Sequence, residues 1–333
     1  MIYPKALKVG EKIGFFSPSS PVTVFAPNRF ERAKAYLQAH GFELVTGSLT
    51  GCADSYRSGS IQERAEELNQ LIRDPSVRCI MSTIGGSNSN SLLPYIDYEA
   101  LKKDPKIIIG YSDVTAILLG IYAQIGLVTF YGPALVASFG ELPPLVDETL
   151  SSFLDILCAE PSVYQYTMPT VWTDVKVDWE TQYTAKPTYK NEWKFFGAGK
   201  VHGRLLGGNL NTMAGIWGSP YMPEICSGDI LLIEDSLKCI ATVERSFAHL
   251  LSCGVFDKVG AVVLGKHELF DDKGSGRSPL EVLIEVLNGR ELPILYGFDC
   301  CHTHPMLVVP LGAQMTIDFD KQVLQLESPW LSP

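Results

Sequence analysis

A serine stands where the chain is expected to turn from a strand into a helix. The segment Ile107–Val114 reads IIIGYSDV, so three β-branched apolar residues lead into a short turn that carries Ser112. The β-branched run favours a buried strand, and the apolar residues that follow favour a helix over 114–124. This arrangement exposes the Ser112 hydroxyl at a helix N-terminus, where free backbone amides stabilise negative charge. Such a position suits nucleophilic attack.

The turn resembles a nucleophile elbow, although the second glycine of the G-x-S-x-G motif is absent. In such a turn the amide of the following residue, here Asp113, can donate a hydrogen bond to an oxyanion. Ser112 or Asp113 can equally be a plain N-cap, because both residue types are common at helix starts. The local pattern therefore leaves two interpretations open, a nucleophile and a cap.

A nucleophilic serine needs a base and usually a carboxylate that orients the base. The sequence offers six histidines as bases, at positions 40, 202, 249, 267, 302 and 304. His302 follows a predicted strand over Ile294–Phe298, and His304 would share its face in an extended segment, so both are candidates. Glu234 and Asp235 directly follow the apolar run 231–233, although solvated residues at a strand end would show the same pattern.

Three other segments could bind an anion, a nucleotide or a metal. The segment Ile84–Asn88 follows a predicted buried strand, and its amides can face an anion or form a plain tight turn. The segment Gly260–His267 approaches a Walker A motif, but a histidine replaces the Ser or Thr and the segment reads as a strand, so no phosphate loop is predicted. The cluster Cys300–His304 lacks a second pair at zinc-finger spacing, so no metal is predicted.

Strands and helices alternate through the first half of the chain. Ser60 and Glu63 form a capping box at the start of one of these helices. The β-α-β-α order predicts a mostly parallel sheet covered by helices, with ligands at the carboxyl ends of its strands. The strands are expected at 12–16, 42–45, 77–84 and 106–109, and the helices at 27–40 and from residue 60.

An aromatic-rich segment over 161–196 shows little helical periodicity. Long connections of this kind often carry binding residues, but rings that pack between two domains would give the same pattern. The second half resumes with a helix after Gly207-Gly208-Asn209, strands at 229–233, 259–264 and 294–298, and a terminal hairpin over 314–326. We therefore divide the chain into an N-terminal α/β domain (1–160), a connection (161–196) and a C-terminal domain (197–333).

The composition limits the partners of the protein. The 333 residues are 46% apolar, and 27 Lys and Arg against 37 Asp and Glu give a net charge of −10. An acidic chain without basic runs argues against nucleic acid and anionic membranes and leaves a small molecule as the expected ligand. The start of the chain lacks the apolar core of a secretory signal, and Gly, Pro and Gln interrupt the charge-free segment 114–140, so neither export nor a membrane span is expected. The eight cysteines are therefore expected to be reduced cytosolic thiols.

Five segments occur in the order found in one known family. They are Gly85-Gly86, the segment Gly110–Asp113, LLGGNL at 205–210, LIED at 232–235, and 302–312 with its HTHP and PLG runs. Together they resemble the LD-carboxypeptidase family of serine peptidases over nearly the whole chain, and within it the microcin C self-immunity peptidases. The order of all five favours the nucleophile over the cap for Ser112. One departure is Cys301, because the family usually has glycine before its histidine, and the bulk of a thiol can alter the backbone angle there.

The resemblance implies a catalytic triad of Ser112 as nucleophile, His302 as general base and Glu234 as orienting carboxylate, with no metal and no cofactor. The family's oxyanion hole falls on the backbone amides of Gly86 and Asp113. The implied fold is α/β, with an N-terminal Rossmann-like parallel-sheet domain, a smaller C-terminal α/β domain and the active site at their interface. Family members are cytoplasmic and often dimeric, so a cytoplasmic homodimer is expected.

Two activities occur within this family. The carboxypeptidases release D-alanine from murein tetrapeptides, whereas the immunity peptidases cut the amide-type bond between an aminoacyl or peptidyl group and a modified adenylate. The polar run at Ser87 and Asn88 and the aromatic connection favour the second, because a ring stacked on a base contributes about 1–3 kcal/mol. The resemblance implies Trp179 as the stacking residue, with Trp172 second. The murein activity is the enzymatic alternative, and a binding module with Ser112 as a cap is the non-enzymatic one.

Overall fold

The central strands of the first half are largely apolar because they lie inside a sheet that is covered on both faces. The computed structural model describes residues 1–159, 162–300 and 302–332. Its first sheet has the strand order β14-β5-β4-β3-β1-β2, in which β14 is antiparallel to β5 and the other pairs are parallel. The strands are β1 Lys12–Phe16, β2 Glu43–Thr46, β3 Val77–Ser82, β4 Ile107–Gly110, β5 Thr129–Tyr131 and β14 Val309–Leu311.

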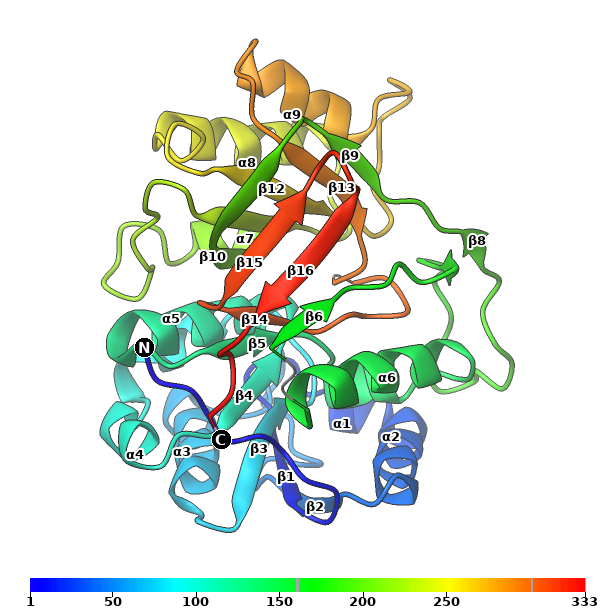
Figure 1. Ribbon diagram of the computed structural model, residues 1–333. Coiled ribbons are helices and arrows are strands. Elements are labelled where there is room, and N and C mark those ends of the chain that lie inside the picture. Colours follow the sequence, from blue (N-terminus) through cyan, green and yellow to red (C-terminus); the bar gives the residue numbers. More distant parts are fainter. Residues whose placement is uncertain (160–161, 301, 333) are drawn as a thin grey trace.

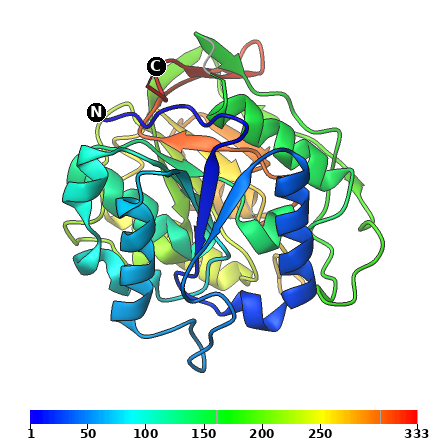
Figure 2. The same cartoon turned by 90° about the horizontal axis from the view of Figure 1, so that it is seen from below.

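Helices flank this sheet on both sides (Figure 1). Seen from below, the blue helix α2 and the lighter blue α3 lie on opposite sides of the dark blue strand β1 (Figure 2). The predicted capping box is confirmed at the start of α3, where Ser60 accepts from the Glu63 amide and the Glu63 carboxylate accepts from the Ser60 amide. The helices are α1 Val22–Phe25, α2 Pro27–Ala39, α3 Ile61–Arg73, α4 Tyr98–Lys103, α5 Thr115–Ile125 and α6 Leu145–Leu157, with short helical turns at Ser89–Tyr95, Ser112–Val114 and Leu135–Phe139.

The charge-free segment owes its composition to burial in protein. The helix α5 packs against β4, β5 and β14 of the first sheet and also against β10 of the second. Its residues from Thr115 to Tyr122 are all buried, so a charged side chain among them would lose its hydration without a partner. Among the described residues, no helix is long and apolar enough to cross a membrane.

The second sheet has eight strands in the order β6-β16-β15-β10-β11-β12-β13-β9. The pairs from β10 to β13 are parallel, and the remaining pairs are antiparallel. Its strands are β6 Val163–Gln165, β9 Lys194–Phe196, β10 Lys200–Asn209, β11 Ile230–Glu234, β12 Ala261–Gly265, β13 Ile294–Phe298, β15 Gln314–Asp318 and β16 Val323–Glu327. The helices of this half are α7 Leu210–Ala214, α8 Ile240–Ser252 and α9 Pro279–Leu287, of which α8 and α9 lie at the top of Figure 1.

The two halves of the chain exchange strands. The strand β14 comes from the second half but completes the first sheet beside β5, and β6 follows α6 but pairs with β16 of the second sheet. The predicted α/β class, with a mostly parallel sheet in the N-terminal half, is confirmed, and the second sheet combines a parallel centre with antiparallel edges. The predicted boundary at 160 and 161 lies outside the described residues, so the three-part division stays a prediction.

The aromatic connection contains more pairing than its composition suggested. The strands β7 (Val171–Trp172) and β8 (Tyr189–Lys190) form a separate antiparallel pair, and β6 and β9 are edge strands of the second sheet. The stretch between β7 and β8, which holds Trp179, has no helix or strand. A backbone bridge joins its first residue, Thr173, to His304, and side-chain contacts hold the part around Trp179.

Glycines allow β10 to lie against its neighbours, and they also hid this strand in the sequence. The helix expected after Asn209 is present as the short α7, but the strand β10 that leads into it was not predicted. Gly207 has φ +130°, and a Cβ there would lie 1.9 Å from the Leu232 carbonyl oxygen on β11. Only glycine fits this position, because any side chain would push β10 away from its parallel partner.

Replacing Gly207 with alanine should therefore destabilise the protein by about 2–4 kcal/mol, because the added methyl group clashes with backbone. The matched control is Gly218→Ala, since Gly218 also has positive φ (+77°) but nothing within 4 Å of the added Cβ. The control should cost about 1–2 kcal/mol, the conformational part alone. Urea unfolding of both variants measures the difference, and equal losses would contradict the clash.

Candidate active site

Ser112 lies at a strained turn between β4 and α5. It has φ +60°, which is uncommon for a residue with a side chain and costs on the order of 1–3 kcal/mol. The turn is tight because Gly110 has no side chain, since a Cβ there would lie 2.5 Å from Ser82 Oγ. Two hydrogen bonds hold the strained residue. The Ser112 amide donates to Tyr131 Oη (3.2 Å), and Thr115 Oγ1 donates to the Ser112 carbonyl (2.6 Å).

The glycine pair after β3 packs directly against this turn. A Cβ on Gly85 would lie 2.8 Å from Ser112 Cβ and 3.0 Å from the Asp113 nitrogen. Gly86 has φ +150°, and a Cβ there would lie 2.2 Å from Ser19 Oγ. Both positions therefore require glycine for the chain to come this close to Ser112. The backbone between β3 and the turn at Ser89–Tyr95 thus forms one wall of the space beside the serine.

The buried Asp113 side chain holds this wall in place. Its carboxylate accepts hydrogen bonds from the Asn88 and Ser89 amides, each at 2.9 Å, and its carbonyl accepts from Ser89 Oγ (2.5 Å). Burial raises the pKa of Asp113, against the lowering effect of the Ser89 and Asn88 amide hydrogen bonds. The side chain of Asp113 therefore holds the loop at Asn88 and Ser89, while its backbone amide lies in the turn directly after Ser112.

His302 and Glu234 meet beside this turn. His302 Nδ1 lies 2.7 Å from Glu234 Oε2, and the other Glu234 oxygen, Oε1, accepts from Tyr131 Oη (2.6 Å) and Asn209 Nδ2 (3.0 Å). Glu234 ends β11 and is 0% exposed. Burial alone would raise the pKa of Glu234, but His302 and the hydrogen bonds lower it overall. The carboxylate therefore stays ionised inside the protein.

The environment of His302 is that of a strengthened base. Burial alone would lower its pKa, but the charge of Glu234 and the hydrogen bond to it raise the pKa above 6.5. The Nδ1–H group of His302 donates a hydrogen bond to Glu234, which leaves the unprotonated Nε2 free to accept a proton. The Tyr111 ring packs edge-on against the imidazole at 4.9 Å between centroids. Such an imidazole can take a proton from a neighbouring hydroxyl.

His304 has a different carboxylate partner from His302. Its Nε2 lies 3.8 Å from Glu141 Oε2, and its Nδ1 is buried without a hydrogen-bond partner among the described residues. Burial lowers the pKa of His304 to about 3, so this ring is neutral. Cys301, which directly precedes His302 in the sequence, lies outside the described residues.

A cavity of about 520 Å³ opens over Ser112 and His302. Of the predicted substrate contacts, Trp179 and Ser87 line it, as does Gly86. Trp172 lies elsewhere, with its ring 5.5 Å from that of Tyr189 and below Lys266 Nζ. The Asn88 side-chain oxygen accepts from Arg64 (2.6 Å) and from Ser19 (3.0 Å), so it serves the loop itself.

Several residues of the site were not anticipated. Tyr131 and Asn209 bind the Glu234 carboxylate, and further charged and polar side chains line the cavity, namely Lys176, Lys186, Asn211, Lys238 and Glu268. Asn209 had a usable signal, because it ends a glycine-rich run before a helix. Among the described residues, no group of three or more His, Cys, Asp or Glu side chains could hold a metal ion.

The chain matches two models of one family. Residues 13–132 match the LD-carboxypeptidase N-terminal domain, and residues 202–317 match the LD-carboxypeptidase C-terminal domain. Ser112 lies in the first match, and Glu234 and His302 lie in the second. Trp172 and Trp179 lie between the two matched segments.

Similar proteins and structures cover the whole chain. A Vibrio cholerae protein named "putative carboxypeptidase" is 75% identical over 99% of this chain and 99% of its own. The microcin C7 self-immunity protein MccF of Escherichia coli is 59% identical over 98% of this chain and 96% of its own. Two solved structures of MccF, its apo state and its complex with aspartyl sulfamoyl adenosine, each match at a TM-score of 0.98 with 58% identity and 100% of both chains covered.

The pKa of His302, followed by its NMR signals, should lie above 6.5, because the buried Glu234 carboxylate favours the protonated ring. Glu234→Gln should lower this pKa, since the amide keeps the shape of the side chain but removes its charge. Glu268→Gln is the matched control. Glu268 also raises the pKa of His302, but its contribution ranks behind that of Glu234, so the shift should be smaller. A pKa unchanged in Glu234→Gln would show that the pair is not coupled.

Proposed function

The chain belongs to the LD-carboxypeptidase family of serine peptidases, and on this basis we propose that it hydrolyses the amide-type bond between an aminoacyl or peptidyl group and a modified adenylate. The observation that carries the proposal is a single cavity that is lined by Ser112, by His302 with its carboxylate partner, and by the indole ring of Trp179. MccF, which binds aspartyl sulfamoyl adenosine, supports the substrate class through its similarity over the whole chain.

In the proposed mechanism Ser112 is the nucleophile. Its Oγ attacks the carbonyl carbon while His302 Nε2 takes the hydroxyl proton, and Glu234 stabilises the imidazolium that forms. The backbone amides of Gly86 and Asp113 donate to the oxyanion. When the tetrahedral intermediate collapses, the carbon–nitrogen bond breaks and His302 protonates the leaving nitrogen. Water, deprotonated by His302, then hydrolyses the ester on Ser112 and restores the enzyme.

The charges of the cavity agree with an anionic substrate. Lys176, Lys186 and Lys238 line it, together with the carboxyl groups of Asp235 and Glu268. Burial raises the pKa of both Asp235 and Glu268, and it lowers the pKa of Lys186, which pairs with Glu141. A phosphate-like group or an acidic amino acid would be attracted to such lysines. This supports an adenylate that carries an acidic aminoacyl group.

The release of D-alanine from murein tetrapeptides is the second candidate. The family models that match this chain are those of LD-carboxypeptidases, and the same serine, histidine and carboxylate would perform that reaction. A peptide without a nucleobase makes no use of an indole ring as a stacking surface. The role of Trp179 therefore separates the two substrates.

The proposal includes a cytoplasmic homodimer. The cysteines at 52, 226 and 253 are exposed free thiols, which persist in a reducing compartment. Light scattering of the purified protein tests the dimer, and a monomer mass would reject it.

Ser112→Ala should reduce hydrolysis of aspartyl sulfamoyl adenosine by about 10⁴-fold or more, because no other group can form the acyl-enzyme. Mass spectrometry of the released aspartate measures this loss, and a murein tetrapeptide is assayed in parallel. A fluorophosphonate should label the unmodified protein at Ser112, whereas a cap serine is not labelled. Full activity in the variant would reject the nucleophile, and release of D-alanine alone would establish the second candidate.

Trp179→Ala should raise the KM for aspartyl sulfamoyl adenosine by about tenfold or more, because a lost base-stacking contact costs about 1–3 kcal/mol. The kcat should change little, since the ring does not touch the reacting bond in this proposal. Trp172→Ala is the matched control and should leave KM unchanged, because its ring packs against Tyr189 and Lys266. The reverse pattern would assign stacking to Trp172.

A further inference from the structure

The Trp179 ring rests on a buried cation. The guanidinium carbon of Arg29 lies 4.7 Å from the centroid of the indole, and Arg29 is fully buried. The same indole lines the cavity over Ser112. Because the guanidinium occupies one face of the ring, a nucleobase can stack only on the other face. The position of Arg29 therefore fixes the face on which stacking is possible.

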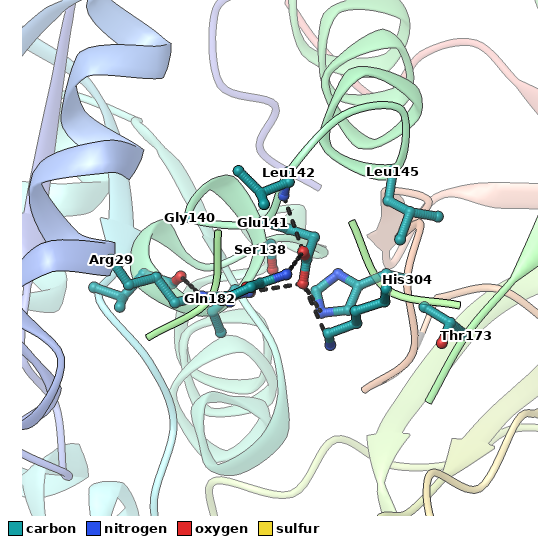
Figure 3. A network of polar contacts seen from close by, with 12 residues as sticks. Arg29, Ser138, Gly140, Glu141, Leu142, Leu145, Thr173, Gln182 and His304 are labelled. Atoms are coloured by element: carbon teal, nitrogen blue, oxygen red, sulfur yellow. Dashed lines mark hydrogen bonds and ion pairs between the residues drawn. The ribbon is translucent and has the colours of Figure 1, made fainter. Parts of the chain in front are cut away.

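The guanidinium itself cannot turn. Its Nε donates to the Val136 carbonyl (3.0 Å), Nη1 donates to Gln182 Oε1 (2.6 Å), and Nη2 donates to the Ala137 carbonyl (2.8 Å) and to Glu141 Oε2 (3.1 Å). Figure 3 shows Arg29, Gln182 and Glu141 joined in this network. Four hydrogen bonds to a planar group hold its plane, so the ring packed on it is held as well.

The segment that carries Trp179 is attached to α2 at two further points. The Glu180 carboxylate accepts from the Asn28 amide (3.1 Å) and the Arg29 amide (3.3 Å) in the first turn of α2. Gln182 bridges Arg29 and Glu141, since its Nε2 donates to Glu141 Oε1 (2.5 Å). A segment without helix or strand is thus fixed by side chains, although Glu180 and Arg29 are 151 positions apart.

The negative charge of Glu141 offsets the free-energy cost of burying the Arg29 cation. Glu141 forms an ion pair with Arg29 in which both side chains are 0% exposed, and Lys186 Nζ, on the cavity wall, lies 3.3 Å from the same oxygen. Burial alone would raise the pKa of Glu141, but the surrounding basic groups lower it to about 2. The carboxylate therefore remains charged and keeps Arg29 in place over the whole working pH range.

From these contacts we infer that Arg29 is a positioning residue for substrate binding. It holds the Trp179 ring in the orientation in which the ring stacks on the nucleobase, and it acts through the ring without touching the substrate. This inference rests on the proposed function, because it assigns the position of the stacking residue of that reaction. It adds a part of α2, remote in sequence from the nucleophile, to the determinants of nucleotide affinity.

A double-mutant cycle between Arg29 and Trp179 tests the inference. Arg29→Gln should raise the KM for aspartyl sulfamoyl adenosine, and the dissociation constant of AMP, by about five- to tenfold with kcat nearly unchanged. In the Trp179→Ala background, Arg29→Gln should add less than about twofold, because the ring through which it acts is gone. Additive effects of the two substitutions, or a loss confined to kcat, would overturn the positioning role.

A second variant covers the case in which Arg29→Gln does not fold, as thermal melting would show. Glu180→Ala removes a half-buried side chain that fixes the same segment, and it should raise the KM about two- to fivefold. Glu31→Ala is the matched control on α2, because Glu31 forms a surface ion pair with Lys34, and it should leave KM unchanged. Equal KM values for Glu180→Ala and the control would overturn the inference.

The two proposals fail in distinguishable ways. If Trp179→Ala leaves both the KM and the AMP dissociation constant unchanged, the stacking role in the proposed function is wrong and the positioning role falls with it. If Trp179→Ala weakens binding while the Arg29 and Glu180 variants do not, the proposed function stands and only the positioning role is overturned.

Discussion

The buried carboxylate of Glu234 is the constraint on which the rest of the site depends. An ionised carboxylate without contact with water costs on the order of several kcal/mol unless other groups compensate it. Its compensation comes from three places, namely Tyr131 on β5, Asn209 at the end of β10, and His302 after β13. Tyr131 belongs to the first sheet and the others belong to the second. The site is therefore complete only when the two sheets are packed together. Tyr131 Oη also accepts a hydrogen bond from the Ser112 amide, so it links Glu234 to the serine.

The same docking explains why so many glycines lie around Ser112. The serine is strained and lies between two sheets, so the backbone must approach it from three sides without side chains in the way. Gly85 clears the space beside its Cβ, Gly110 allows the tight turn, and Gly208 accommodates Thr115 and Tyr131, which would lie within 3.0 Å of an added Cβ. The α5 helix, free of charged side chains, then fills the space between the sheets. Packing around the turn thus holds the strained serine, while its side chain remains open to the cavity.

Features of this structure could be predicted from the sequence where they depend on neighbouring residues, and could not where they depend on residues far apart in the chain. Ser112, Glu234 and His302 could be proposed because each follows a strand-like apolar run, and because parallel strands gather such ends at one edge. The strand β10 was hidden by Gly203, Gly207 and Gly208, which allow close approach to Gly228, to Leu232 on β11, and to Thr115 and Tyr131, contacts that no local pattern contains. Trp172 and Trp179 could not be separated, since their segment has no periodicity and its position is set by Arg29 and Glu141, far away in the chain. Long-range pairing of this kind is invisible in the spacing of residues.

Chemistry and recognition are built in different ways in this protein. The proposed triad sits at the ends of strands whose positions are set by two sheets, and those strands lie in the segments that match the family models. Trp179 lies in the segment between the two matches, where the backbone has no regular pairing of its own and is fixed by side chains to α2. A loop of this kind can change its residues, and so its substrate, without disturbing the sheets that hold the nucleophile. Such a loop must be held in one conformation by contacts with other segments, and the buried Arg29–Glu141 pair makes these contacts through Gln182 and Trp179. In this proposal, substrate choice depends on an ion pair that touches neither the substrate nor the triad.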